Sequence, residues 1–142
     1  MLAIIVGTHG NFAVELLKTC EMICGKVNNA KAVTLVPGEG SEDIVRKYET
    51  ALAELDCSDG VVFLNDLFGG SPYNAACRVA VKDISYGIVT GVNLSMLIEM
   101  VGLQLTGEKL NIQEVMVRAA NAGNDGIKKF HVSKIHDEED DL

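Results

Sequence analysis

Short apolar runs alternate along the chain with segments whose apolar residues recur at helical spacing. A run of about four to eight apolar residues bounded by turn residues is typical of a strand buried in a parallel sheet. Apolar residues three and four positions apart indicate an amphipathic helix. We therefore predict strands over residues 2–6, 31–36, 60–65 and 84–89. We predict helices over residues 11–24, 41–55, 72–81, 94–101 and 111–122.

Local signals mark several ends of the predicted helices. Gly25 can stop the first helix, which would bury a face made of Phe12, Leu16, Cys20 and Ile23. Ser41 suits the N-cap of the second helix. Asn111 and Glu114 have the spacing of a capping box at the start of the fifth.

The alternating order of strands and helices predicts an α/β fold. We expect an open, mostly parallel sheet of four strands, flanked by helices on both faces, in a single domain over residues 1–136. Residues 128–135 are a candidate last strand, although their alternation is imperfect. Residues 137–142 contain five consecutive acids and are expected to form a solvated tail.

Charge and composition exclude several classes of function. The net charge is −8, and the five tail acids leave 15 acids against 12 bases in the rest of the chain, so no basic surface for nucleic acid is expected. No apolar run approaches the roughly 20 residues that span a bilayer. The four cysteines have no zinc-ligand spacing and no secretory signal before them, so we expect reduced thiols in a cytoplasmic protein without a metal or cofactor.

Two reactive side chains follow different predicted strands. In an open parallel sheet, ligands bind outside the carboxyl ends of the strands. His9 lies in the glycine-flanked loop 7–10 after the first strand, and Asp66 directly follows the third strand. Both loops emerge at the same edge, so we expect the two side chains to meet although they are 57 positions apart. A carboxylate bonded to one imidazole nitrogen would fix the tautomer and leave the other nitrogen free to attack.

The loop after the third strand has the composition of an anion cradle. Gly69 and Gly70 let the backbone approach a ligand, Ser71 falls at the N-cap, and Pro72 suits the first helical position. Free amides and the helix dipole would then face a phosphate. The loop alone also fits an ordinary tight turn before a capped helix. The chain has no nucleotide-binding glycine motif, so a phosphoryl group would come from a donor protein or small molecule.

The chain resembles the IIA component of the mannose family of the sugar phosphotransferase system. The resemblance covers about residues 1–130. It is carried by Ile4-Ile5-Val6-Gly7-Thr8-His9-Gly10, by Val36-Pro37-Gly38-Glu39, by residues 64–76 (Leu-Asn-Asp-Leu-Phe-Gly-Gly-Ser-Pro-Tyr-Asn-Ala-Ala) and by residues 91–97. Leu67 and Phe68 depart from the residues common in the family and bring no hydroxyl to the site.

The resemblance implies a phosphocarrier in which His9 receives a phosphoryl group from the phosphocarrier protein HPr and passes it to a IIB component. The IIB component would phosphorylate sugar entering through membrane IIC and IID components, and the carrier would be peripheral to them. The position of Asp66 implies the orienting group, and that of Ser71 a contact to the phosphoryl group. The family also implies a homodimer that exchanges a C-terminal strand, here residues 128–135. The chain would be a IIA polypeptide separate from IIB.

Three other functions share some of these residues. A IIA-like subunit of a dihydroxyacetone kinase would use His9 and Asp66 but pass the phosphoryl group to a different acceptor. A regulatory module would sense an anion without covalent chemistry. A hydrolase would use Ser71, His9 and Asp66 as a triad, although Ser71 does not lie in a Gly-x-Ser-x-Gly motif.

Overall fold

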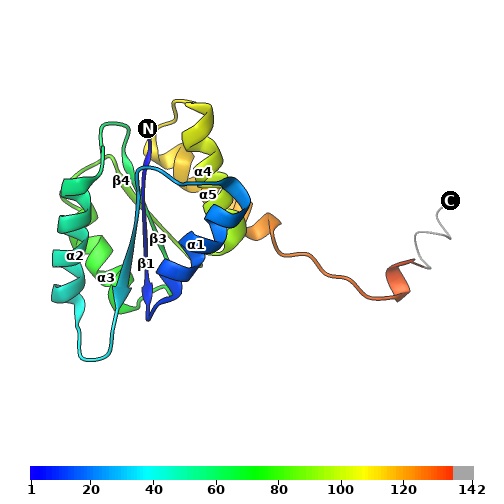
Figure 1. Ribbon diagram of the computed structural model, residues 1–142, viewed down its shortest axis with the longest axis horizontal. Helices are drawn as coiled ribbons and strands as arrows, with labels where there is room; N and C mark the ends of the chain where they lie inside the picture. Colours follow the sequence, from blue (N-terminus) through cyan, green and yellow to red (C-terminus); the bar gives the residue numbers. More distant parts are fainter. Residues whose placement is uncertain (136–142) are drawn as a thin grey trace.

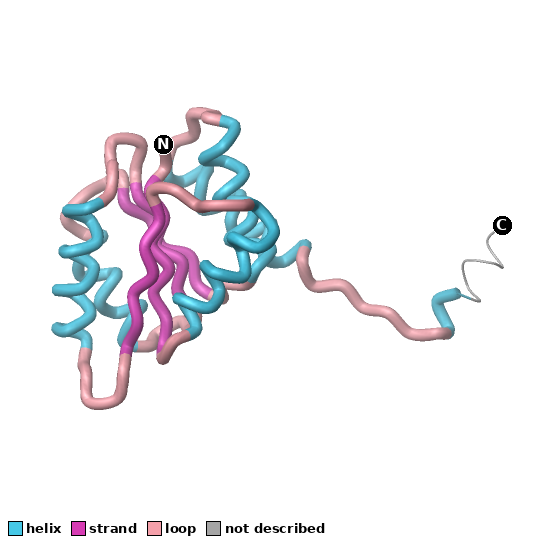
Figure 2. The backbone as a smooth tube through the Cα atoms, viewed as in Figure 1, coloured by secondary structure: helices cyan, strands magenta, loops and turns pink. Residues whose placement is uncertain are grey.

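A computed structural model describes residues 1–135 and contains one four-stranded sheet covered by helices on both faces (Figures 1 and 2). The strands are β1 (Ala3–His9), β2 (Ala30–Leu35), β3 (Val61–Asn65) and β4 (Tyr86–Thr90). The helices are α1 (Phe12–Cys24), α2 (Ser41–Glu54), α3 (Ser71–Ala80), α4 (Leu94–Thr106) and α5 (Ile112–Asp125). All strand pairs are parallel, in the order β2-β1-β3-β4. The predicted fold class is confirmed.

Alternating residues of the central strands face two separate cores. Ile4 and Val6 of β1 pack with residues of α1, α4 and α5, whereas Ala3 and Ile5 pack with α2 and α3. Successive side chains of a strand point to opposite faces, so a continuous apolar run supplies both cores. Burial on both faces explains why residues 3–6 of β1 and residues 61–64 of β3 are all apolar.

The chain changes direction between β1 and β3. It leaves β1 through α1 to reach β2 on one side, then crosses back through α2 to β3 on the other side of β1. The segments that follow β1 and β3 therefore diverge at the carboxyl ends of these two strands, with α1 on one face of the sheet and α3 on the other. This topological switch point is where doubly wound sheets bind their ligands.

Several local predictions need correction. The N-cap of α2 is Gly40, and Ser41, predicted as the N-cap, is the first helical residue. β1 does not end before Gly7 but continues to His9, because Gly7, Thr8 and His9 keep their parallel pairing with β2. On α1, the buried residues are Ala13, Leu16 and Cys20, whereas Phe12 and Ile23 are exposed. Since the apolar residues of α1 exceed what one face holds, the pattern alone allowed two nearby faces, and packing on the sheet selects the one centred on Leu16.

The segment after α5 leads away from the sheet (Figure 1). Residues 128–135, predicted as a last strand, pair with no strand among the described residues. Residues 133–135 instead form a helical turn, in which Ile135 donates its backbone N–H to the Val132 carbonyl at 3.2 Å. A strand needs a neighbour for its backbone hydrogen bonds, and residues 128–135 have none within residues 1–135. The predicted acidic tail, residues 137–142, lies outside the described residues. Within the described part, no helix has the length and apolar character needed to cross a membrane.

Candidate functional site

His9 and Asp66 meet at the carboxyl edge of the sheet, as predicted. His9 is the last residue of β1, and Asp66 follows the last residue of β3. One carboxylate oxygen of Asp66, Oδ2, accepts the backbone N–H of His9 at 3.0 Å and lies 2.9 Å from the ring Nδ1 of the same residue. The His9 side chain is 45% exposed and that of Asp66 18% exposed. The pair is therefore held in place by hydrogen bonds at Asp66, while the imidazole ring of His9 remains accessible to solvent.

The hydrogen bond to Asp66 selects one form of the imidazole. An ionised carboxylate can only accept hydrogen bonds, so Nδ1 must carry the proton. In the neutral ring, Nε2 then has the free lone pair. Because Asp66 also accepts the backbone N–H of His9, ring and main chain are held by a single oxygen. The arrangement presents Nε2 as a nucleophile with a defined direction.

The N-terminus of α3 lies beside the His9 ring. Gly70 is the N-cap, and its carbonyl accepts the N–H of Asn74 at 2.9 Å. The prediction that Ser71 occupies the N-cap is therefore wrong by one position: Ser71 is the first helical residue, with Pro72 second. The extended backbone of Gly70 begins the helix one residue earlier than the polar side chain suggested.

Gly70 approaches the imidazole too closely for any side chain. A Cβ atom at Gly70 would lie 2.7 Å from Cε1 and 3.3 Å from Nε2 of His9. The start of α3 therefore adjoins the edge of the ring that holds the free lone pair. Gly69, just before it, has a φ of 83°, in the left-handed region that favours glycine. The two glycines of the predicted cradle thus have distinct geometric roles.

The first turn of α3 offers amides to an anion. Backbone N–H groups in a first helical turn have no partner within the helix. Those of Ser71 and Tyr73 remain, since Pro72 has none, and no side chain caps the helix among the described residues. Together with the positive end of the helix dipole, they form a site suited to a phosphoryl group on Nε2.

Ser71 does not complete a hydrolytic triad. Its side chain is half-buried at the start of α3, and no hydrogen bond joins it to His9 among the described residues. A serine nucleophile needs the base within hydrogen-bond reach. The ring nitrogen that faces Asp66 is Nδ1, and the turn next to Nε2 is provided by backbone at Gly70.

Two buried residues that the sequence analysis did not single out lie next to the backbone that carries His9 and Asp66. Tyr48 of α2 and Asn65 of β3 are fully buried. The Asn65 amide donates to the carbonyl of Gly7 at 2.8 Å and to the Tyr48 hydroxyl at 3.0 Å. The Tyr48 hydroxyl donates to the carbonyl of Pro72 at 2.8 Å. Burial holds the pKa of Tyr48 above its ordinary value, aided by the charge of Asp66, so the hydroxyl keeps its proton.

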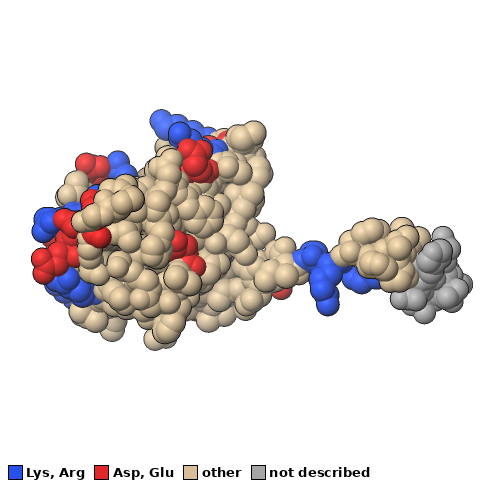
Figure 3. All heavy atoms as spheres, turned by 90° about the horizontal axis from the view of Figure 1, so that it is seen from below, with Lys and Arg blue, Asp and Glu red and all other residues tan. Residues whose placement is uncertain are grey.

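The surface around His9 carries exposed apolar side chains. Leu67 is 59% and Phe68 73% exposed, and the Phe68 ring packs on Tyr73 with centroids 4.9 Å apart. Figure 3 views the molecule from the carboxyl edge of the sheet, where charged side chains gather mainly over the α2 end and uncharged surface fills most of the centre. Exposed aromatic side chains on such a surface are typical of protein docking sites.

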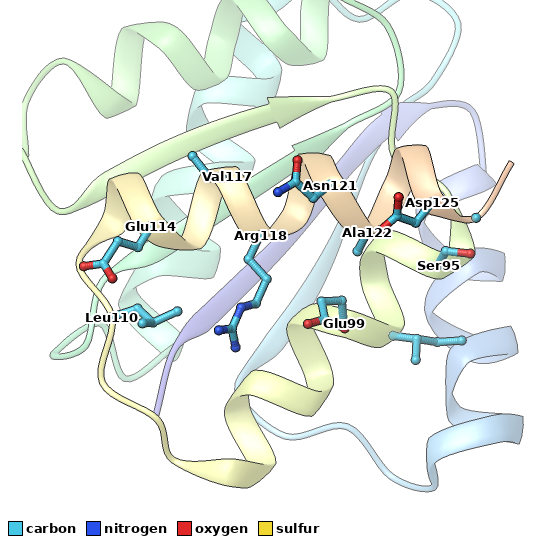
Figure 4. Close-up of a pocket in the computed structure, with 11 residues that line it drawn as sticks. Ser95, Glu99, Leu110, Glu114, Val117, Arg118, Asn121, Ala122 and Asp125 are labelled. Atoms are coloured by element: carbon cyan, nitrogen blue, oxygen red, sulfur yellow. The ribbon is translucent and has the colours of Figure 1, made fainter.

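A hollow of the described surface lies away from His9 and Asp66. It has a volume of about 690 Å³ between α4 and α5 and is lined by Ser95, Ile98, Glu99, Leu110 and Val117, among others (Figure 4). Arg118 in this hollow already pairs with Glu108 at 2.8 Å. His9 and Asp66 do not line it. The candidate site is therefore separate from this hollow.

Gly70→Ala is expected to slow any reaction at Nε2 about tenfold while leaving the fold intact. The φ of −73° at Gly70 is accessible to alanine, so the backbone is not strained. The new methyl group would instead push the imidazole from its place, and small misplacements of reacting groups are costly in rate. The measurement is the rate of the phosphoryl uptake that the sequence predicts for His9. Gly40→Ala is the matched control, because Gly40 is the N-cap of α2 with open space around it. Equal rates for both variants would contradict the close contact.

Comparison with known proteins gives a consistent result. A family model described as "PTS system fructose IIA component" matches residues 3–119. The chain is 42% identical over 134 residues to the mannose-specific EIIAB component of Escherichia coli, covering 94% of this chain but only 41% of that protein. It thus spans about two fifths of the length of that relative. It is 33% identical to the fructose-specific EIIA component of Bacillus subtilis, covering 95% of this chain and 92% of that protein.

Solved structures show the same architecture. A phosphotransferase system component EIIA from Streptococcus agalactiae superposes with a TM-score of 0.80 at 26% identity, covering 92% of this chain and 98% of that one. A mannose/sorbose-specific IIA subunit from Enterococcus faecalis gives a TM-score of 0.80 at 25% identity, covering 92% and 95%.

Proposed function

The chain belongs to the family of fructose IIA components of the sugar phosphotransferase system, within its mannose group, and from that premise we propose that His9 is a phosphoryl carrier. His9 takes a phosphoryl group from HPr and hands it to a IIB component. The observation that carries this proposal is the bond between His9 Nδ1 and Asp66, which leaves Nε2 free beside the N-terminus of α3.

The transfer follows from the geometry of the pair. Nε2 attacks the phosphorus of the donor's phosphohistidine, so that a new N–P bond forms as the donor's N–P bond breaks. The phosphorylated ring keeps its proton on Nδ1 and gains positive charge, which the Asp66 carboxylate stabilises. The transferring group spreads negative charge over its oxygens, and the backbone amides of Ser71 and Tyr73 in the first turn of α3 would stabilise that charge. Donor and product are both phosphohistidines, so the step is close to thermoneutral.

The docking partners are HPr and IIB, each bound in turn to the same edge. Leu67, Phe68 and Phe12 are exposed apolar side chains on the segments that follow β3 and β1, and they supply the apolar contacts to both partners. A carrier that must meet two proteins in each cycle needs short-lived complexes. We place the protein in the cytoplasm, peripheral to the membrane IIC and IID components that IIB serves.

Phosphorylation by purified components tests this function. The full chain is incubated with phosphoenolpyruvate, enzyme I and HPr, and the expected product is one acid-labile phosphate per chain. Addition of a IIB component should then remove the label. Labelled protein that is discharged only by a dihydroxyacetone kinase subunit would assign the chain to that acceptor instead. Absence of any label would exclude the carrier function and favour a non-covalent anion sensor.

We further propose a homodimer in which residues 128–135 of one copy pair with β4 of the other. The two edge strands, β2 and β4, differ in how well they are protected against pairing with a strand of another chain. In β2, the Leu35 carbonyl accepts the backbone N–H of Gly10, which follows β1. Because successive carbonyls of a strand point to opposite sides, the Thr34 carbonyl points outward, where the Lys47 ammonium donates to it at 2.7 Å. Charged side chains of this kind block strand addition. Among the described residues no side chain bonds the outer edge of β4, and Ile127, Phe130, Val132 and Ile135 are exposed beyond α5.

Phe130→Glu is expected to convert the dimer to a monomer at micromolar concentration. Phe130 is 75% exposed in the single chain, so a charge there costs nothing in the monomer but disfavours burial against a second copy. Sedimentation velocity on the full chain gives the mass. Met22→Glu is the control, because Met22 is 87% exposed on α1, away from this segment, and should leave the dimer unchanged. A wild-type monomer at the same concentration would exclude the dimer.

A further inference from the structure

We infer that Tyr48 and Asn65 are positioning residues for phosphoryl transfer, which together set the distance between His9 and the N-terminus of α3. The inference rests on the proposed carrier function. Neither residue touches the transferred group; each is joined by hydrogen bonds to the backbone of an element that does carry a reacting part.

The hydrogen bonds form one continuous chain beneath the site. The Asn65 amide donates to the Gly7 carbonyl at 2.8 Å, two residues before His9, and to the Tyr48 hydroxyl at 3.0 Å. The hydroxyl donates onward to the Pro72 carbonyl at 2.8 Å, in the first turn of α3. The direction of each bond is fixed, because the carbonyl of Gly7 requires the amide N–H and that of Pro72 requires the hydroxyl proton.

These contacts connect the parts whose relative placement decides the chemistry. β1 carries His9, Asn65 immediately precedes Asp66, and α3 supplies the amides beside Nε2. Tyr48 reaches this point from α2, which otherwise contributes no group to the site. All of the side chains involved are fully buried, so water does not replace a lost bond.

The absence of a side chain at Gly7 leaves space for the Tyr48 hydroxyl next to β1. A Cβ atom at Gly7 would lie 2.1 Å from the Tyr48 hydroxyl oxygen. A glycine in the middle of a buried strand weakens that strand, so its presence marks a close approach. Here the approaching group is the Tyr48 hydroxyl, which passes β1 to reach Pro72. The ring atoms Cε1 and Cζ would each lie 2.9 Å from the same Cβ, so Gly7 makes room for the edge of the ring and, most closely, for its hydroxyl.

Ring packing and hydroxyl bonding are separable at Tyr48. The ring packs edge-on against Phe63 with centroids 5.2 Å apart, within the core that faces α2 and α3. Tyr86 of β4 also packs against Phe63, with centroids 6.1 Å apart, and its hydroxyl takes no part in the chain described above. The two tyrosines therefore form a natural pair of test and control.

Tyr48→Phe keeps the ring and removes the link between Asn65 and Pro72. We expect the maximal rate of phosphoryl uptake from phosphorylated HPr to fall about tenfold, because a small displacement of α3 from Nε2 disturbs the reacting geometry. The HPr concentration at half-saturation should not change, since the docking surface around Phe68 is untouched. Tyr86→Phe should keep both values. Rates are measured on the full chain well below the melting temperature of each variant.

The outcomes separate this inference from the function on which it rests. Wild-type protein that accepts no phosphate would overturn the carrier function itself. Labelled wild type with an unchanged maximal rate for Tyr48→Phe would overturn only the positioning role, as would an equal loss in Tyr86→Phe. Should Tyr48→Phe fail to fold, Asn65→Leu decides, because it removes the same link from β3; it should show the same tenfold loss of maximal rate and the same half-saturation.

Discussion

His9→Ala is expected to abolish phosphorylation of the chain by phosphorylated HPr, lowering the rate by more than about 10⁴-fold. The proposed nucleophile is Nε2 of a single side chain, and the carboxylate and amides near it can stabilise a transferred group but cannot accept one. The measurement is incorporation of radioactive phosphate, with acid lability as the signature of phosphohistidine.

Two controls make that result specific. His131 is exposed and lies beyond α5, where its ring contacts Ser133, so His131→Ala should be labelled as fast as the wild type. The His9 side chain is about half exposed, and its backbone N–H still bonds to Asp66 in the alanine variant, so unfolding should shift by no more than about 0.5 kcal/mol. Label on folded His9→Ala protein would assign the chemistry to another residue.

The sequence was sufficient to predict the architecture because strands that are buried on both faces of a sheet consist of consecutive apolar residues, a pattern that is easy to recognise. Strands such as β1 and β3 are continuous apolar runs, and the glycine-rich and polar segments between them fall at the strand ends. Parallel order then brings the ends of β1 and β3 to one edge. The meeting of His9 with Asp66 follows from this topology, without any knowledge of side-chain detail.

The buried face of a helix and its exact first residue are harder to predict, because neighbouring residues often suit the same position equally well in the sequence pattern. On α1, Phe12 and Ala13 are both apolar, and only packing on the sheet decides that Ala13 is buried and Phe12 exposed. At α3, Ser71 has the side chain of a good N-cap, yet Gly70 takes that position. The reason is the approach of the turn to the His9 ring, which leaves no room for a side chain at residue 70.

The chain of hydrogen bonds from Asn65 to Pro72 was beyond prediction for a different reason. Tyr48 falls on the apolar face of its helix, where a pattern counts its ring and ignores its hydroxyl. The hydroxyl meets partners that are 17 and 24 positions away, and each belongs to a different element. A polar residue within an otherwise apolar strand, here Asn65, is the one local sign that a buried network exists.

These features divide the site into two layers with different tolerance to change. His9, Gly70 and the first turn of α3 form the layer that we propose faces the partner proteins and acts on the transferred group. Tyr48, Asn65 and Gly7 lie beneath and are fixed by tight packing. Since protein interiors leave little free volume, a change in the lower layer shifts the upper one, whereas the exposed residues Leu67 and Phe68 can vary with the partner.

Asp66→Asn is expected to slow phosphoryl transfer about 100-fold while preserving the orientation of His9. The backbone N–H of His9 is always a donor, so the amide oxygen of an asparagine would replace Oδ2 and still accept both N–H groups. What disappears is the negative charge that stabilises the phosphorylated, positively charged ring. The amide nitrogen would take the place of Oδ1, which is buried and has no hydrogen-bond partner among the described residues.

That buried nitrogen should cost about 1–3 kcal/mol of stability, a loss that chemical denaturation measures independently of rate. Asp83→Asn is the matched control, because one oxygen of Asp83 likewise accepts a backbone N–H and a side-chain donor, both from Ser85, before β4 begins. The rate of that variant should equal the wild-type rate. ¹⁵N NMR of the His9 ring distinguishes the two roles of Asp66. A proton retained on Nδ1 with slow transfer assigns the loss to charge, a proton moved to Nε2 assigns it to orientation, and an unchanged rate would show that Asp66 serves neither.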